Sequence, residues 1–255
     1  MGHTICIGNH KGGVGKTTTA ISLSAALAIA EKKTLLIDID PKGNATTGLG
    51  INKKMIKKSL HRGFLGEATA DELIIGSDIE ALKIIPARMD LFRTEAEILT
   101  KSGKEKLLDG LLKDIKASYD YIIIDSPPSL NLLTMNALTA ADSMLIPLQC
   151  EFYAVECLDQ LFKFYNVLKK NFNPALRIEG ILLTMYEEDE MISRQIAQNA
   201  KTHFKEMLFE AIIPKDRGFR ESALHKKPLL LYDINSSGAR SYLDLAKEII
   251  HSEMK

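Results

Sequence analysis

Short apolar runs alternate with longer segments of helical period along nearly the whole chain, and this alternation limits the fold more than any other feature. Runs rich in Ile, Leu and Val are typical of strands buried on both faces of a parallel sheet. The predicted strands are Thr4–Asn9, Thr34–Ile39, Leu82–Pro86, Tyr121–Asp125, Ser143–Leu148, Ile178–Met185 and Leu208–Pro214. The predicted helices are Gly15–Glu31, Lys104–Ser118, Asn131–Ala141, Ala154–Phe172, Met191–Lys205 and Ala239–Met254. The pattern predicts an α/β fold in which a mostly parallel, twisted sheet of about seven strands carries helices on both faces.

The bulk composition predicts one domain over residues 1–255 and excludes several classes of protein. The chain has 33 basic and 33 acidic residues, so binding to nucleic acid or to an anionic membrane would need a local basic patch. Cys6, Cys150 and Cys157 have no CxxC spacing, which favours core residues over disulfides or a zinc site. We expect neither a signal peptide nor a membrane span, and a cytoplasmic location.

A glycine-rich loop joins the first predicted strand to the first predicted helix. It reads His10-Lys11-Gly12-Gly13-Val14-Gly15-Lys16-Thr17-Thr18. In this position the backbone N–H groups of residues 12–18 can turn inward on phosphates, and the helix N-terminus adds its positive dipole end. Lys16 would then reach the β- and γ-phosphates, and the Thr17 hydroxyl would bind Mg²⁺. The alternative is an accidental glycine-rich turn, which the strand and helix on either side disfavour.

Two other predicted strands end in acidic residues. The second strand ends in Asp38 and continues through Asp40 into a glycine-containing loop, a suitable place for a switch. The strand Tyr121–Asp125 ends in a single acid followed by Pro127, as expected of a Walker B segment that holds Mg²⁺. A lone aspartate at a strand end is otherwise typical of a turn or a helix cap. Asp38, deeper in its strand, is expected to support the loop or the metal shell.

Two segments are locally basic. Residues 191–228 contain eight basic and four acidic side chains, and a dimer would double the contacts that such an excess makes with DNA phosphates. The candidate DNA contacts are Arg194, Lys201, Lys205, Arg217, Arg220, Lys226 and Lys227, and the alternative is an ordinary solvated basic surface. Residues 51–66 contain five basic side chains and no acidic one, a pattern that is typical of a solvated helix face, with a binding patch as the alternative.

The combination of Lys11 with the glycines, Lys16 and Thr17 resembles the deviant Walker A motif of the ParA and MinD superfamily. The similarity to ParA/Soj-type partition ATPases covers nearly the whole chain, including residues 131–147, 149–154, 183–186 and 238–250. The resemblance implies ATP and Mg²⁺ as cofactors, with Lys11 reaching the partner's phosphates across a homodimer that forms with ATP. It also implies that Asp40 orients the attacking water and belongs to the metal site with Thr17 and Asp125, and that Pro214 and Asp216 recognise adenine.

The resemblance further implies a protein that binds double-stranded DNA without sequence preference, associates with the nucleoid and is stimulated by a ParB-like partner. The chain departs from the family at His10 and Lys42, where glutamine is usual, and at Asp216, where asparagine is usual. It looks like the short form of ParA, and its end lacks the amphipathic helix of MinD, so no stable membrane association is expected.

Other functions remain open from the sequence. A ParA-like ATPase could position a cargo other than a chromosome, such as a chemoreceptor cluster, flagellar machinery or an enzyme compartment. A regulatory module could sense nucleotide with little turnover. An iron–sulfur reductase is disfavoured because the three cysteines do not form its bridging thiolate arrangement.

Overall fold

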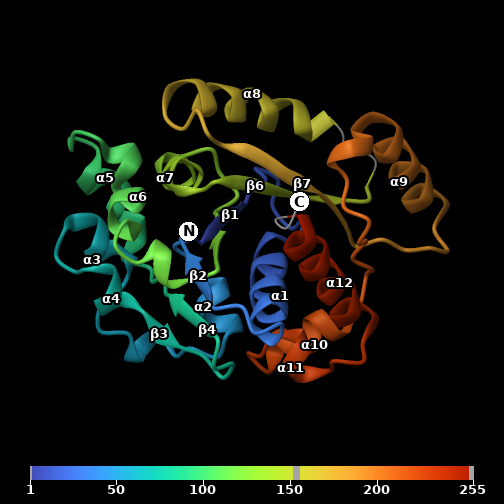
Figure 1. Ribbon diagram of the computed structural model, residues 1–255, viewed down its shortest axis with the longest axis horizontal. Coiled ribbons are helices and arrows are strands. Elements are labelled where there is room, and N and C mark those ends of the chain that lie inside the picture. The colour runs from blue at the N-terminus through green and yellow to red at the C-terminus, as the bar shows by residue number, and fades with distance from the viewer. Residues whose placement is uncertain (1, 152–155, 253–255) are drawn as a thin grey trace.

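The computed structural model describes residues 2–151 and 156–252, which form a layered α/β protein around one sheet (Figure 1). The sheet has seven strands in the order β3-β4-β2-β5-β1-β6-β7. Their bounds are β1 His3–Ile7, β2 Thr34–Asp38, β3 Ile75–Gly76, β4 Leu82–Ile85, β5 Tyr121–Asp125, β6 Ser143–Gln149 and β7 Arg177–Thr184. All pairs are parallel except the edge pair of β3 with β4.

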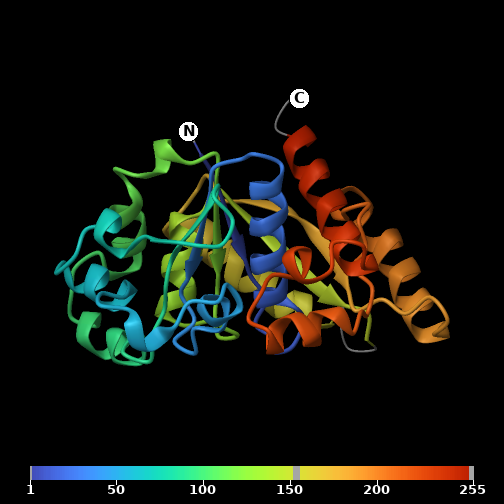
Figure 2. The same ribbon diagram turned by 90° about the horizontal axis from the view of Figure 1, so that it is seen from below.

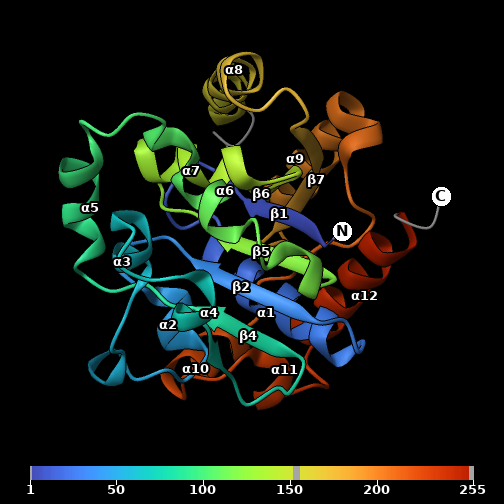
Figure 3. The same ribbon diagram turned by 60° about the vertical axis from the view of Figure 1, so that its left-hand side comes forward.

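Helices cover both faces of the sheet, as Figures 1 and 3 show. On one face lie α1 Lys16–Ile29, α10 Gly218–Leu224, α11 Leu229–Tyr232 and α12 Ser237–Ser252. The other face carries α6 Leu107–Leu112, α7 Leu132–Ala140 and α8 Glu156–Asn171. Further helices are α2 Asn44–Gly48, α3 Leu60–Leu65, α4 Ala70–Leu73, α5 Leu91–Ile98 and α9 Met191–Phe204. Short 3₁₀ turns are η1 Lys53–Met55, η2 Lys104–Lys106, η3 Lys116–Ser118 and η4 Lys205–Met207.

Two hydrophobic cores, one on each face, explain why the strands are apolar without interruption. Successive residues of β5 alternate between the cores: Ile122 and Ile124 pack into one, and Ile123 into the other. This alternation is the two-residue period of a strand, and a strand covered on both faces needs an apolar side chain at every position. The prediction of a mostly parallel sheet with helices on both faces is therefore confirmed.

One predicted strand was wrong. Segment 208–214 makes only isolated bridges with the sheet, between Leu208 and Ile181 and between Pro214 and Tyr186. In between, the backbone N–H groups of Glu210 and Ala211 donate to the carboxylate of Glu248 on α12, at 2.9 and 2.6 Å. These donors are no longer available for a regular ladder. The seventh strand is instead the short antiparallel edge strand β3, whose two residues carry no apolar run.

The helix predictions were less accurate in their boundaries. The predicted helix Lys104–Ser118 is divided into η2, α6 and η3. Parts of three predicted segments lie outside the described part of the chain. These parts are the first residues of the predicted helix 154–172, the last residues of the predicted helix 239–254, and residues 152–154 of the segment that resembles the ParA family. The side chain of Cys157 also lies outside it. Cys6 and Cys150 are buried free thiols, as predicted. None of the described helices is long and apolar enough to cross a membrane.

Candidate functional site

The carboxyl ends of three central strands bring the predicted phosphate loop and both acidic segments to one edge of the sheet. Asp125, the last residue of β5, pairs with Ile7 at the end of β1 and with Asp38 at the end of β2. The loop of residues 8–15 leaves β1 at this edge and enters α1 at Lys16. Figure 2 shows this edge along the bottom of the molecule, where α1 begins.

The glycine-rich loop contains two backbone conformations that favour glycine. Gly13 and Gly15 have φ values of 80° and 93°, in the left-handed region that glycine adopts without strain. Gly12 and Gly13 are exposed, so a ligand can approach their backbone N–H groups closely. Polar anchors hold the loop: Asn9 Nδ2 donates to the Pro147 carbonyl at 2.8 Å, and Thr184 Oγ1 donates to the Val14 carbonyl at 3.0 Å.

A cavity of about 300 Å³ opens between the loop and the acidic segments. Its lining comes from several separate parts of the chain: Gly12, Gly13, Gly15, Lys16, Thr17, Thr18, Asp40, Lys42, Asn44, Ser126, Pro128 and Met185. The structure thus brings together most of the residues predicted to hold phosphates. Val14 is buried beneath the loop, and Lys11 lies outside this cavity.

The ammonium group of Lys16 is placed for an anion. Lys16 is only 7% exposed, and its Nζ donates to the backbone carbonyl of Lys11 at 2.7 Å. Burial lowers the pKa of Lys16 to about 8, although Asp125 and Asp40 favour its charged form. A buried lysine gains strongly from a partner of opposite charge, so this position suits a phosphate.

Lys11 does not line the cavity and forms an ion pair with Glu151 instead. Its Nζ lies 3.1 Å from Oε2 of Glu151, and both side chains are partly exposed. The ammonium group is therefore accessible at the surface beside the phosphate loop. Such a position is compatible with contact to a second subunit, which the family resemblance implies for this lysine.

Asp125 fits a metal shell because its carboxylate is buried without partners. Both of its oxygens are inaccessible to solvent, and neither accepts a hydrogen bond of standard geometry from the described residues. Burial raises the pKa of Asp125 well above its ordinary value, the nearby Asp38 raises it further, and the Thr17 hydroxyl opposes the shift. A buried carboxylate without donors costs free energy that a cation, directly or through its water, would offset.

Asp38 has a different environment from Asp125, although the two residues are neighbours in the sheet. Its Oδ2 accepts hydrogen bonds from the backbone N–H and the hydroxyl of Thr46, both at 2.7 Å. The Thr46 hydroxyl in turn accepts from the N–H of Ala87 at 3.0 Å. Burial raises the pKa of Asp38 to about 6, against these hydrogen bonds. Asp38 therefore ties α2 to the end of β2.

Asp40 lies in the segment between β2 and α2 and lines the cavity. Its Oδ1 accepts from the N–H of Lys42 at 2.9 Å, and its carbonyl accepts from the N–H of Gly43 at 2.8 Å. Asp40 thus has a defined position in a loop that Asp38 anchors. Both Asp40 and Lys16 line the same cavity, so a phosphate held by Lys16 would lie within reach of this carboxylate.

The two predicted adenine-binding residues have different surroundings. Pro214 lies next to the end of β7, where the N–H of Lys215 donates to the Tyr186 carbonyl at 2.9 Å and Met185 reaches the cavity. The carboxylate of Asp216 accepts from the N–H groups of Gly218 and Gly238 and from the Ser237 hydroxyl, at 2.7–3.0 Å. Burial acts to raise the pKa of Asp216, but these hydrogen bonds outweigh it and lower the pKa. Its side chain thus joins α10 to α12, and only its backbone is left for a base.

The predicted DNA contacts are mostly exposed, but they form two groups. Arg194 and Lys201 lie on α9, with Lys205 just after it, whereas Arg217, Arg220, Lys226 and Lys227 belong to α10 and its two ends. Figure 1 shows α12 between α9 and α10. One subunit therefore presents two separate basic surfaces.

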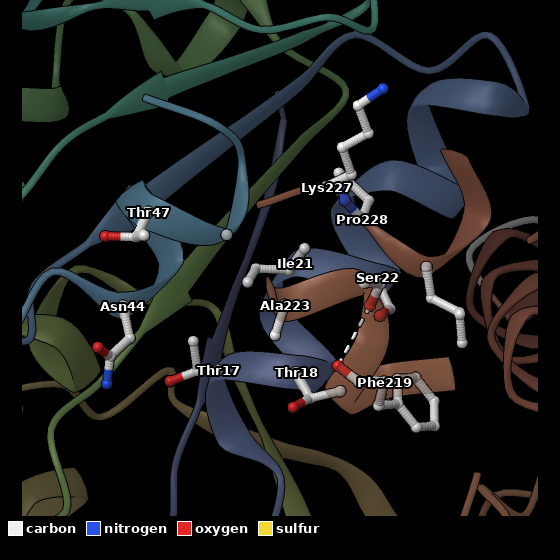
Figure 4. Close-up of a pocket in the computed structure, with 13 residues that line it drawn as sticks. Thr17, Thr18, Ile21, Ser22, Asn44, Thr47, Phe219, Ala223, Lys227 and Pro228 are labelled. Atoms are coloured by element: carbon white, nitrogen blue, oxygen red, sulfur yellow. Dashed lines mark hydrogen bonds between the residues drawn. The ribbon is translucent and has the colours of Figure 1, made fainter. Parts of the chain in front are cut away.

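A second cavity of about 290 Å³ adjoins the cavity between the glycine-rich loop and the acidic segments (Figure 4). No pattern in the sequence predicted this second cavity. Thr17 and Thr18 of α1 lie at its base, Asn44 and Thr47 of α2 on one side, and Phe219 and Ala223 of α10 on the other (Figure 4). These residues come from three elements, and α10 is far from the other two in sequence. The two cavities share Thr17, Thr18 and Asn44 in their linings, and this is the observation that connects the second cavity to the proposed nucleotide site.

Comparison with known proteins gives consistent results. The family described as an AAA domain matches residues 2–178. The chain is 47% identical over 250 residues to the "Chromosome partitioning protein ParA" of Myxococcus xanthus, covering 98% of this chain and 88% of the relative. It is 45% identical over 249 residues to the "Sporulation initiation inhibitor protein Soj" of Bacillus subtilis, covering 98% of both.

Solved structures with the same fold include nucleotide-bound proteins. A cobyrinic acid a,c-diamide synthase from Mycobacterium smegmatis with bound ADP and magnesium is 31% identical, has a TM-score of 0.88, and is matched over 100% of this chain and 96% of that one. The cell division ATPase MinD of Pyrococcus furiosus is 28% identical with a TM-score of 0.82, matched over 99% and 100%. The fold shared with these proteins is that of the P-loop ATPases.

Proposed function

This chain belongs to the ParA/Soj family of partitioning ATPases, and from that premise we propose that it is an ATP-hydrolysing switch for DNA segregation. In this proposal Mg²⁺-ATP closes a homodimer, the dimer binds double-stranded DNA without sequence preference, and hydrolysis releases it. The observation that carries the proposal is the buried, unpartnered carboxylate of Asp125 opposite the start of α1, where Lys16 and Thr17 begin the helix.

Each part of the site has a defined task in this proposal. The backbone N–H groups of residues 12–18 and the Lys16 ammonium hold the phosphates, because these residues surround the cavity. Thr17, Asp40 and Asp125 would hold Mg²⁺, and the ion would neutralise charge on the phosphates. Pro214 and the backbone at Asp216 bound the space for the base.

Hydrolysis requires a group that orients water at the terminal phosphate. We assign this task to Asp40, because it lines the cavity and its loop is anchored through Asp38 and Thr46. Lys11 acts between subunits: it leaves Glu151 and contacts the phosphates of the partner subunit, which stabilises the transition-state charge as an arginine finger does. The site is then complete only in the dimer.

The basic side chains on α9 and around α10 support the DNA part of the proposal. Because each subunit presents two groups, a dimer would present four, and the salt dependence of binding would steepen accordingly. A ParB-like partner would stimulate the slow intrinsic hydrolysis and so couple it to movement of cargo. The protein would accordingly be found in the cytoplasm, associated with the nucleoid.

The experiment that tests this proposal is DNA binding by the full chain with Mg²⁺-ATP, repeated with Mg²⁺-ADP, over a series of salt concentrations. With ATP we expect DNA binding whose log affinity falls linearly with the log of the salt concentration. With ADP we expect little DNA binding. Equal binding with both nucleotides would contradict a nucleotide-gated switch. Absence of binding to either nucleotide in calorimetry would contradict the whole assignment.

The relatives at 42–47% identity are named as partitioning or Soj proteins, which favours chromosomal or plasmid DNA over other cargo. A positioning ATPase for a different cargo would share the ATP cycle, and the neighbouring gene would distinguish the two. A regulatory module without appreciable turnover is tested by ATPase measurements with DNA and partner present.

A further inference from the structure

The basic run at residues 53–58 follows a turn that touches the surface carrying Lys226 and Lys227. After α2 the chain turns at Gly50, whose φ is +79°. A Cβ placed on Gly50 would lie 3.3 Å from the backbone carbonyl oxygen of Lys226, so the two segments are in direct contact. Figure 3 shows the chain that follows α2 beside α10, and Figure 2 shows both at the carboxyl edge of the sheet.

The same basic run is attached to the segment that lines the phosphate cavity. Lys53 Nζ donates to the backbone carbonyl of Lys42, and its Cε lies 2.8 Å from the position that a Cβ on Gly43 would take. Further along, Arg88 Nη1 donates to the carbonyl of Ile56 at 2.7 Å. Residues 53–58 are therefore tied to the loop between β2 and α2.

The lysines of residues 53–58 differ in whether they have a partner among the described residues. Lys58 pairs with Glu72, and Lys53 is occupied by the Lys42 carbonyl. Lys54 and Lys57 are exposed and make no ion pair with the described residues. Lys226 and Lys227, across the Gly50 contact, are likewise exposed and without an ion pair to any described side chain. The segments that touch at Gly50 and Lys226 thus each carry two exposed lysines with no ion pair to a described side chain.

We propose that residues 53–58 together with Lys226 and Lys227 form one continuous surface for the sugar–phosphate backbone of duplex DNA, with Lys54 and Lys57 as phosphate contacts. This inference rests on the proposed function and adds residues that lie far from the 191–228 segment in sequence. Because the surface is joined to the loop that carries Asp40, a nucleotide that orders this loop also sets the position of Lys54. DNA binding is thereby coupled to nucleotide through Lys53 and Gly50.

The test uses the full chain with Mg²⁺-ATP and a duplex of random sequence. For the Lys54→Ala/Lys57→Ala variant we expect weaker binding, and a plot of log affinity against log salt that is shallower by about 0.9 for each phosphate that is no longer neutralised. The matched control is Lys33→Ala/Lys83→Ala, which removes the same charge from two exposed lysines that share a cavity at the opposite edge of the sheet. This control should keep the slope of the wild-type chain.

Two more arms make the result decisive. Lys54→Arg/Lys57→Arg keeps both charges and should restore the wild-type slope, and light scattering should show an unchanged ATP-dependent dimer for the alanine variant. An alanine variant with the wild-type slope would overturn this surface while leaving the proposed function intact. The same holds if the alanine variant keeps DNA binding but no longer binds anionic lipid vesicles, because the run would then serve a membrane. Failure of the wild-type chain to bind DNA would instead contradict the proposed function.

Discussion

At the scale of single residues, two neighbouring aspartates in the sheet show how environment separates chemical roles. Asp38 and Asp125 pair across β2 and β5, and both are fully buried. Asp38 accepts three hydrogen bonds from protein donors, and Asp125 accepts none of standard geometry from the described residues. The hydrogen bonds of Asp38 make it a structural anchor, and the lack of them at Asp125 is why we assign that carboxylate to the proposed metal site.

Replacement of Asp125 by asparagine tests this division. Without nucleotide we expect Asp125→Asn to be neutral or to raise the free energy of unfolding by on the order of 1 kcal/mol, because burying a carboxyl group with a raised pKa destabilises the folded state at neutral pH and a neutral amide does not. The variant should also lose most of the stabilisation by Mg²⁺-ATP, which is about 2.7 kcal/mol at a ligand concentration of about 100 times Kd. Thermal unfolding with and without Mg²⁺-ATP measures both effects. A variant that Mg²⁺-ATP still stabilises fully would remove Asp125 from the metal shell.

The pKa of Lys16 predicts a pH dependence of nucleotide binding. Burial lowers this pKa to about 8, and a bound phosphate, which favours the charged form, raises it again. Binding therefore takes up a proton where Lys16 is neutral in the free protein, so affinity should fall as the pH rises above this pKa. Calorimetry in two buffers of different ionisation enthalpy would detect this proton. Affinity that stays constant as the pH rises would contradict the prediction.

Asp40→Ala should separate nucleotide binding from hydrolysis. Asp40 lines the cavity but is not one of the groups assigned to bind the phosphates. We therefore expect the variant to keep ATP and DNA bound. Its turnover should fall roughly 10²-fold or more, which is typical for the loss of a general acid–base group. Phosphate release and DNA retention measured on the same sample check the two halves. Turnover at the wild-type rate would exclude Asp40 from the reaction.

At the scale of elements, the contacts of the segment between η4 and α10 explain why this segment is not the strand that the sequence predicted. Its apolar residues Ile212 and Ile213 have the composition of a strand, and Ile213 still donates its N–H to Leu183 of β7. The Glu248 carboxylate, however, binds the backbone N–H groups of Glu210 and Ala211. A contact from a helix distant in sequence decided this element, which no local pattern can predict.

Glu248→Ala should therefore destabilise more than a surface charge change on the same helix. The buried N–H of Ala211 loses its acceptor, which costs roughly 1–3 kcal/mol in the free energy of unfolding, whereas the exposed N–H of Glu210 can bond water. The control Asp244→Ala removes an exposed ion pair with Lys247 and should cost less than about 1 kcal/mol. Chemical denaturation of both variants measures the difference. Equal effects would show that the Glu248 carboxylate does not hold this segment.

At the scale of the whole molecule, the features that matter for function lie at one edge of the sheet. The phosphate loop, the Asp40 loop and the surface of Lys226 and Lys227 meet there, whereas Lys33 and Lys83 lie at the opposite edge. In this fold the carboxyl ends of parallel strands converge, so residues from separate strands become neighbours. In the proposed function, nucleotide and DNA would therefore be coupled over a short path.

Lys11→Ala tests whether the molecule acts as a dimer. Lys11 lies outside its own phosphate cavity, so monomers of the variant should still bind Mg²⁺-ATP with near wild-type affinity. ATP-dependent dimerisation and DNA binding should disappear together, because the dimer doubles the phosphate contacts. Light scattering and calorimetry on the same preparation separate the two steps. A dimer that persists in the variant would contradict the role of Lys11 between subunits.

The local sequence was sufficient for the parallel sheet and the phosphate loop, because each depends on short-range rules. Apolar runs must be buried on both faces, and the left-handed positions at Gly13 and Gly15 favour glycine whatever surrounds them. Asp40 and Asp125 could be located because they end or follow such strands.

Tertiary structure alone decided the rest. Three features join residues that are distant in sequence. They are the hydrogen bonds of Asp216 with Ser237 and Gly238, the cavity between α2 and α10, and the contact of Gly50 with Lys226. Such contacts depend on how whole elements pack against each other. No period or motif in the chain encodes them locally, so only the assembled fold reveals which side chains remain free to act.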